Sequence, residues 1–173
     1  MLSSKGTTQT TPLSPVEASR ISEPVSPAPY QAIARLAMPD VSRMAFDGTA
    51  PSGHTIRMDT DPDSGGDGTG ADPKSLLLLA LASCTGMDVI SIMRKKRQDV
   101  TAYVINVYAT EAIEHPKIYT YILAEHVITG RNLDPKAMAR ALELSITKYC
   151  PVHAMLSRAT RVEHVYRILV ERS

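Results

Sequence analysis

Short apolar runs separated by turn residues begin the ordered part of this sequence and predict a small antiparallel meander. The runs have strand length and β-rich composition, and they are Tyr30 to Met38, Val41 to Phe46 and His54 to Met58. Asp47-Gly48 is a dipeptide typical of tight turns, so we expect the chain to reverse there.

The residues before this meander have a different composition. Residues 1–29 are rich in Ser, Thr and Pro and offer little apolar surface to bury, which predicts a flexible tail. The remaining residues, 30–173, form one domain in this interpretation. A chain of 173 residues with 43% hydrophobic content is long enough for one sizeable core.

A long apolar segment follows a Gly/Asp-rich loop and predicts a central helix. Asp72 suits the N-cap and Pro73 the first helical position, and the helix should end near Arg97. Its leucines leave almost no polar face in the first half, so we expect burial on most sides. The segment is apolar enough to resemble a membrane span. Asp88 in its middle favours a buried helix of a soluble protein, because a carboxylate in lipid costs about 2.5–3.5 kcal/mol.

The second half of the chain predicts further strands and helices, and with the meander an α+β fold. In order, they are strands Val100 to Ala109 and Ile118 to Val127, a helix from Asp134-Pro135 to about Tyr149, a short helix from Pro151 to Arg158 and a strand from Val162 to Val170. The two longer strands are expected to pair antiparallel.

Charge and composition exclude several classes of partner. Nineteen basic and eighteen acidic side chains leave a net charge of +1, which gives no field for a nucleic acid or an anionic membrane. Two cysteines are too few for the disulfide framework of a small secreted domain. The first residues lack the apolar stretch of a secretion signal, so we expect a cytoplasmic protein.

The cysteines carry the candidate chemistry, although two separated thiols are also ordinary packing residues. Cys150 precedes Pro151 and can begin a helix, where free amides and nearby His153 would favour thiolate. Cys84 lies about three turns inside its helix, beyond the reach of the helix dipole. If Cys84 is the reactive thiol, another segment must supply a cation. No third ligand accompanies Cys150 and His153, so no metal or cofactor is expected.

Three motifs resemble the OsmC/Ohr family of thiol-dependent hydroperoxide reductases. They are Gly68-Thr-Gly-Ala-Asp-Pro73, Leu78-Leu-Ala-Leu-Ala-Ser-Cys84-Thr-Gly-Met87 and Lys148-Tyr-Cys150-Pro-Val-His153. The resemblance extends from Tyr30 to Arg172, and Ser52-Gly53-His54 is typical of a less characterised branch. It implies an intertwined homodimer with antiparallel sheets around two long cysteine helices and with active sites at the subunit interface.

The resemblance also implies a reaction. Cys84 would attack a small organic hydroperoxide and become a sulfenic acid, and Cys150 would resolve it as a disulfide that an external dithiol reduces. A rival hypothesis keeps the fold but not the catalysis: an apolar cleft between subunits would hold a small hydrophobic molecule, with both thiols as packing residues.

Two departures from the family pattern leave the activation of Cys84 open. Lys74 follows the helix-start proline, where characterised members have a Glu that orients an Arg, and Asp88 shares the helical face of Cys84. Arg43 lies in the region that resembles the family's arginine segment and is the first candidate for the activating cation. The rivals are Arg57, His54 and Lys74, the last of which is about 15 Å along the same helix and would have to act across the dimer.

Overall fold

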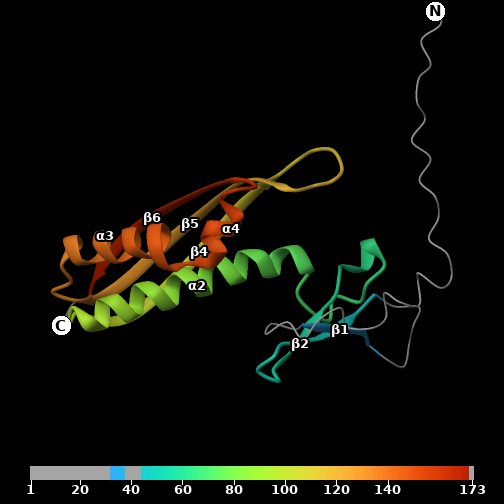
Figure 1. Cartoon of the computed structure of the whole chain (residues 1–173), viewed down its shortest axis with the longest axis horizontal. Helices are drawn as coiled ribbons and strands as arrows, with labels where there is room; N and C mark the ends of the chain where they lie inside the picture. The colour runs from blue at the N-terminus through green and yellow to red at the C-terminus, as the bar shows by residue number, and fades with distance from the viewer. Residues whose placement is uncertain (1–31, 38–43, 172–173) are drawn as a thin grey trace, which may run out of the picture.

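The computed structural model describes residues 32–37 and 44–171, and within them it contains two separate sheets joined by a long helix (Figure 1). The first sheet has three antiparallel strands in the order β1 (Ile33–Leu36), β2 (Phe46–Thr49), β3 (Thr55–Met58). The predicted meander of three antiparallel strands is therefore confirmed, with shorter first and third strands. The second strand is displaced, because β2 begins at Phe46, where the predicted strand from Val41 was expected to end. The predicted tail, 1–29, lies outside the described residues.

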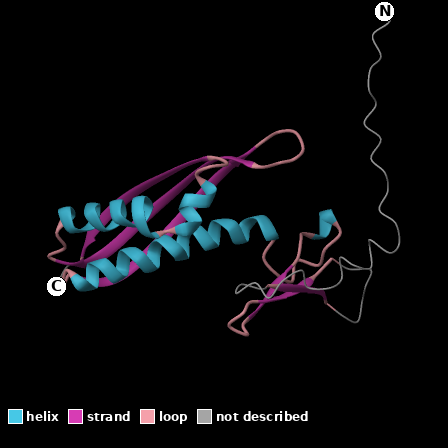
Figure 2. Cartoon of the chain, viewed as in Figure 1, coloured by secondary structure: helices cyan, strands magenta, loops and turns pink. Residues whose placement is uncertain are grey.

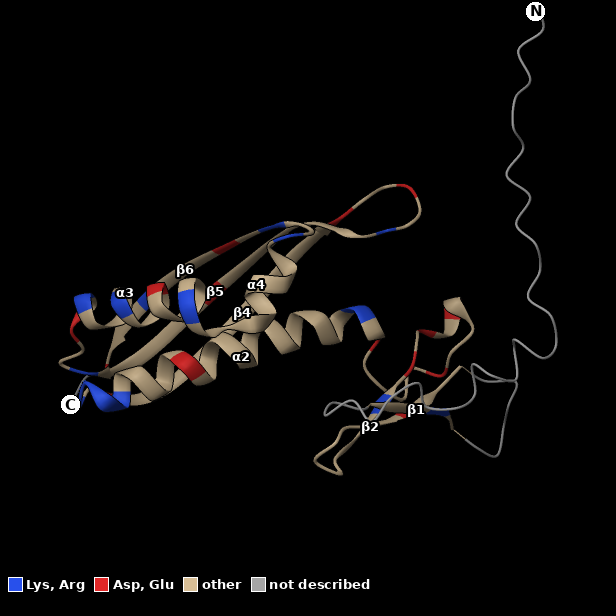
Figure 3. Cartoon of the chain, viewed as in Figure 1, with Lys and Arg blue, Asp and Glu red and all other residues tan. Residues whose placement is uncertain are grey.

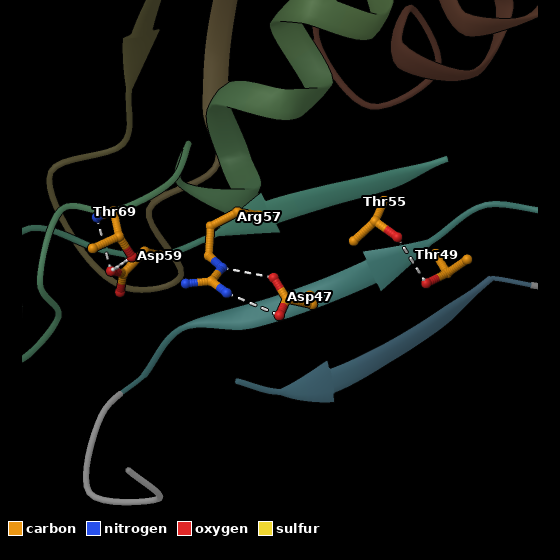
Figure 4. A network of polar contacts seen from close by, with 6 residues as sticks. All are labelled: Asp47, Thr49, Thr55, Arg57, Asp59 and Thr69. Carbon is orange, nitrogen blue, oxygen red and sulfur yellow. Dashed lines mark hydrogen bonds and ion pairs between the residues drawn. The ribbon is translucent and has the colours of Figure 1, made fainter. Parts of the chain in front are cut away.

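The predicted turn at Asp47-Gly48 is wrong, because both residues lie inside β2. Asp47 pairs in register with Arg57 on β3, and their side chains form an ion pair with a Nε–Oδ1 distance of 2.6 Å (Figure 4). The chain instead reverses after Ala50. Gly53 there has a φ of 82° and donates a hydrogen bond to the carbonyl oxygen of Ala50.

The loop between β3 and the long helix is organised around one carboxylate. Asp59 accepts hydrogen bonds from the amides of Thr60, Asp67 and Thr69 and from the Thr69 hydroxyl, and its side chain is buried. Figure 4 shows Asp59 beside Thr69. These bonds, that of the hydroxyl first, lower the pKa of Asp59 to about 2. The loop, which includes the short helix η1 (Pro62–Ser64), is thereby held against the first sheet.

The central helix, α2 (Pro73–Lys95), begins as predicted. The Asp72 side chain accepts hydrogen bonds from the amides of Lys74 and Ser75, and Pro73 takes the first helical position. Figure 3 shows basic residues at both ends of α2 and one acidic band between them. In the single chain only one side of α2 is buried, and exposed Leu79 and Met87 depart from the expected all-round burial.

The second sheet is mixed. Strands β4 (Asp99–Glu111) and β5 (Tyr119–Arg131) pair antiparallel as expected, but β6 (Arg161–Val170) pairs parallel to β5. The connection from β5 to β6 runs through α3 (Pro135–Leu144), a π-helical turn η2 (Ser145–Tyr149) and α4 (Pro151–Leu156). A strand that returns through helices in this way can pair parallel, whereas a hairpin cannot.

The helices cover one face of this second sheet (Figures 1 and 2). Alternate residues of β5 point at them and are fully or almost fully buried, namely Ile122, Ala124, His126, Ile128 and Gly130. Val89 and Met93 of α2 meet Met138 and Leu142 of α3 in the core above this face. The core thus fixes α2 against α3, and this packing positions the two cysteine segments.

Candidate functional site

Cys84 lies in the middle of α2 on the side that faces η2 and α4, and its side chain is half-buried. The apolar residues around it keep the helix in place, with Leu81, Thr85 and Val89 fully buried. The Thr85 hydroxyl donates to the Leu81 carbonyl oxygen, so that this polar group is satisfied within the helix. Cys84 is therefore presented on a rigid element.

Cys150 forms the junction between η2 and α4. Its amide donates to the Ser145 carbonyl oxygen at 2.8 Å and ends the π-helical turn, and Pro151 begins the next helix. The Cys150 sulfur caps that helix by accepting a hydrogen bond from the amide of His153 at 3.2 Å. The predicted break at Pro151 is confirmed, and it turns the thiol toward α2.

The two sulfurs meet. The Cys150 thiol donates a hydrogen bond to Cys84 with a Sγ–Sγ distance of 2.9 Å, and both cysteines are free thiols. Burial, and next the hydrogen bond to Cys84, raises the pKa of Cys150 to about 12, while the His153 amide opposes this shift. The expectation that Cys150 favours thiolate is therefore wrong, because desolvation outweighs the helix start. Cys150 acts as a hydrogen-bond donor to Cys84.

A carboxylate completes the cluster. Asp88 lies one turn after Cys84, and one ligand atom from each of Cys84, Asp88 and Cys150 falls within 4.8 Å of the others. The Ser145 hydroxyl donates to Oδ2 of Asp88 at 3.0 Å and fixes its orientation. Across residues 32–37 and 44–171, these three side chains are the one group of His, Cys, Asp and Glu compact enough to share a metal ion. Two sulfurs and one carboxylate are donors that suit zinc.

Of the predicted activating cations, the three that lie among the described residues are paired elsewhere and not with the thiols. Arg43 lies outside the described residues. Arg57 is paired with Asp47, and His54 shares a hydrogen bond with Ser52. Lys74 forms an ion pair of 2.6 Å with Glu111.

The Lys74 ammonium also donates to the Lys117 carbonyl oxygen at 3.1 Å, so it is held at the start of α2 rather than near Cys84. No lysine or arginine in the described part of the chain hydrogen-bonds to either sulfur. Among the described residues, the hydrogen bond from Cys150 is the hydrogen bond that the Cys84 sulfur receives.

The sequence interpretation missed a chain of three imidazoles beside this site, of which His126 is fully buried and His153 and His164 are partly buried. Tyr103 Oη lies 2.6 Å from Nδ1 of His126, His126 Nε2 lies 3.0 Å from Nδ1 of His164, and His164 Nε2 lies 3.1 Å from Nδ1 of His153. A sequence signal existed, since His126 occupies a core position in the alternating pattern of β5.

An apolar pocket of about 300 Å³ lies farther along the same helix. Its apolar walls are formed chiefly by Leu77, Ile118, Ile122 and Leu156. Thr160 also lines it, and the Thr160 hydroxyl is the one buried side-chain polar atom without a hydrogen-bond partner among the described residues.

Comparison with known proteins gives consistent similarities. Residues 66–165 match the family model described as OsmC-like protein. Protein YhfA of Escherichia coli K12 is 37% identical over 130 residues, which cover 75% of this chain and 93% of YhfA.

Two solved structures agree with the fold. A hypothetical protein from Aquifex aeolicus has 29% identity and a TM-score of 0.70, covering 83% of this chain and 98% of that protein. The organic hydroperoxide resistance protein OsmC of Legionella pneumophila has a TM-score of 0.58 over 79% of this chain and 95% of its own, but only 13% identity. The second likeness therefore concerns the fold alone.

Proposed function

This chain belongs to the OsmC-like protein family, and we propose that it is a thiol-dependent peroxidase that reduces organic hydroperoxides through Cys84 and Cys150. The observation that carries the proposal is the 2.9 Å contact between the two sulfurs, which come from different helices. Free thiols so close can form a disulfide after a small side-chain movement. No bound cofactor is needed for this chemistry.

The reaction has three steps. The Cys84 thiolate attacks the terminal oxygen of the hydroperoxide, so that an S–O bond forms, the O–O bond breaks and the alkoxide leaves as alcohol after taking up a proton. The Cys150 sulfur then attacks the Cys84 sulfur, and the hydroxyl group departs as water with the Cys150 proton. An external dithiol reduces the resulting disulfide by exchange and restores both thiols.

Cys150 has a further part in this proposal. Because burial raises the pKa of Cys150 to about 12, its thiol keeps the proton and can donate it to a Cys84 thiolate. A hydrogen bond to the charged form favours that form. The neighbouring thiol would then take over part of the work of the expected cation, and Arg43 remains a proposed activating residue.

In this proposal, the protein acts as a homodimer in the cytoplasm. Exposed apolar side chains on α2 support a dimer, with Leu77, Leu79 and Met87 46%, 58% and 65% exposed in the single chain. Helix α2 is also long and apolar enough to cross a membrane, and 28% of its most apolar 18-residue stretch is buried in the single chain. A second copy that packs on α2 would cover this surface.

The test is peroxide consumption by the purified protein with a dithiol reductant, comparing an alkyl hydroperoxide with hydrogen peroxide. We expect Cys84→Ser to abolish turnover, and Cys150→Ser to stop after one equivalent with a sulfenic acid that dimedone traps. Ser83→Ala is a matched control, because this exposed neighbour bonds only carbonyl oxygens of its own helix. Multiple turnovers by Cys84→Ser would overturn the proposal.

A second candidate function rests on the pocket near Leu77. Its apolar walls fit a small hydrophobic molecule. In that case the protein binds a ligand without reacting, and the thiols are packing residues. Absence of peroxide turnover, together with retained binding of a fluorescent fatty acid by Cys84→Ser, would favour this function.

A further inference from the structure

The three hydrogen-bonded imidazoles connect the core of the sheet to the segment that carries Cys150. Tyr103 lies on β4, His126 on β5, His164 on β6 and His153 on α4, so the chain crosses all three strands and ends on the helix. The rings of successive histidines are 5.3 Å and 5.1 Å apart between centroids. Neither the proposed peroxidase reaction nor the apolar core requires this arrangement.

The imidazole chain attaches α4 to the second sheet through hydrogen bonds. Helix α4 has six residues, and across residues 32–37 and 44–171 the bond from His153 to His164 is the only side-chain hydrogen bond between α4 and the second sheet. The backbone of the same residue, His153, donates to the Cys150 sulfur at 3.2 Å. A change at His164 therefore reaches the thiol through one residue.

The hydrogen bonds fix the tautomers. A neutral imidazole has one N–H and one bare nitrogen, and a bond between two rings needs one of each. The three histidines must therefore all carry the proton on Nε2, with the Tyr103 hydroxyl donating to His126, or all carry it on Nδ1, with the Tyr103 oxygen accepting. A mixed set would place two protons or two lone pairs face to face.

The same count of N–H groups and bare nitrogens limits how many protons the imidazole chain can take up. One additional proton can be placed on any of the three rings with every bond retained, because the protonated ring donates on both sides. A second additional proton leaves two donors facing each other and breaks one bond. Burial lowers the pKa of His126 to about 4 and that of His153, and burial together with the charges of both neighbours lowers that of His164 to about 3. The rings are thus neutral at pH 7.

Other titratable groups lie on the elements that pack around the imidazole chain, but they do not hydrogen-bond to it. Tyr166 pairs in register with His126 and faces the same side of the sheet, Cys84 and Asp88 lie on α2, and Cys150 begins α4. In the part of the chain that the structure describes, none of their side chains hydrogen-bonds to an imidazole, and no Asp, Glu, Lys or Arg does.

We propose that Tyr103, His126, His164 and His153 form a hydrogen-bonded latch that holds α4, and with it the Cys150 thiol, against Cys84. The latch residues are positioning residues, and they determine how readily the two thiols form a disulfide. Loss of the latch by substitution lets α4 move away from α2. The inference deepens the proposed function, but it concerns the disulfide alone and can be tested without peroxide.

The test is the equilibrium of the intact protein with oxidised and reduced glutathione, in which two protein thiols and one glutathione disulfide give one protein disulfide and two glutathione thiols. The equilibrium constant reports the effective concentration of Cys150 at Cys84. We expect His153→Leu to lower it about tenfold, the size of one lost hydrogen bond. His153→Asn places an amide near the Nδ1 position and should restore most of the loss.

His54→Leu is the matched control, because His54 bonds Ser52 on the first sheet, outside the latch, and it should leave the constant unchanged. A wild-type constant in His153→Leu, or equal losses in the Asn and Leu variants, would overturn the proposal.

A measurement on the unaltered protein covers the case in which His153→Leu fails to fold. The ¹⁵N chemical shifts of the imidazoles distinguish the two neutral tautomers, and we expect His126, His153 and His164 to share one tautomer and to change together as the pH falls. Mixed tautomers would overturn the latch. If peroxide turnover is absent while the glutathione result holds, the peroxidase fails and the latch stands.

Discussion

Ser145 donates a hydrogen bond of 3.0 Å to Asp88, and this bond joins the helix of Cys84 to the π-helical turn that leads into Cys150. The bond holds a carboxylate within 4.8 Å of both sulfurs. A negative charge this close opposes the formation of a thiolate. The arrangement therefore fixes the two segments together, and we expect the carboxylate to restrain the reactivity of the thiols.

Replacing Asp88 should release that restraint. In Asp88→Asn the charge is lost while an amide of the same shape remains, so we expect alkylation of the thiols by iodoacetamide at pH 7 to become about three- to tenfold faster. Ser145→Ala keeps the charge and should change the rate much less. Equal rates in the wild type and in Asp88→Asn would show that the carboxylate does not act on the sulfurs.

Stability should fall in mildly acidic solution. The pKa values of His126 and His164, about 4 and about 3, lie below the ordinary value near 6.5. The unfolded chain therefore binds more protons than the folded protein below about pH 6.5, and the stability that the neutral rings contribute, fully present above that pH, is lost as the pH falls.

Urea unfolding at several pH values between 6.5 and 5 would measure this loss. We expect a slope of about 1.4 kcal/mol per pH unit for each proton taken up, since carboxylates contribute mainly below this range. A His126→Gln protein should show a shallower slope. A free energy of unfolding that is constant over this range would contradict the burial of neutral imidazoles.

The loop before α2 should depend on Asp59. Its carboxylate accepts hydrogen bonds from Thr60, Thr69 and Asp67, so Asp59→Asn places an amide where acceptors are needed. We expect amide hydrogen exchange at Thr69 to rise by about tenfold or more, because a bond to a charged acceptor is lost. Asp63→Asn, at an exposed position of η1, serves as the control and should leave that exchange rate unchanged.

The apolar side of α2 should carry the dimer interface. Leu79 is 58% exposed in the single chain, and Leu79→Lys places a charge where a partner helix or sheet would pack. Sedimentation equilibrium should give a dimer for the wild type and a monomer for this variant. Ile113→Lys, in the loop between β4 and β5, changes a side chain that is 94% exposed and should remain dimeric. A dimer that survives Leu79→Lys would place the interface elsewhere.

Local signals in the sequence were sufficient for the elements and for the cysteine segments. Asp72 with Pro73 and Asp134 with Pro135 mark helix starts through their own capping bonds, so both starts were predicted correctly. The predictions that failed depend on contacts between segments that are distant in the sequence. Asp47-Gly48 has turn chemistry, but pairing of Asp47 with Arg57 across the strands keeps it extended.

The candidate site was predictable only in part for the same reason. Cys84 and Cys150 were identified by motif, but no pattern in one sequence shows that burial, rather than the helix start, sets the pKa of Cys150. His126 and His164 come from strands that pair parallel, and a parallel pairing is not visible in local composition. The imidazole chain therefore required the structure.

The separation of the two cysteines along the chain has a thermodynamic consequence. They lie 66 positions apart, so a bond between them closes a long loop and removes conformational freedom from the unfolded chain, a contribution of about 4 kcal/mol in the loop-entropy description. Oxidation and folding then reinforce each other. In the proposed reaction, formation of the disulfide would raise the resistance of the fold to heat and proteolysis, and its reduction by the dithiol would lower that resistance again in each turnover.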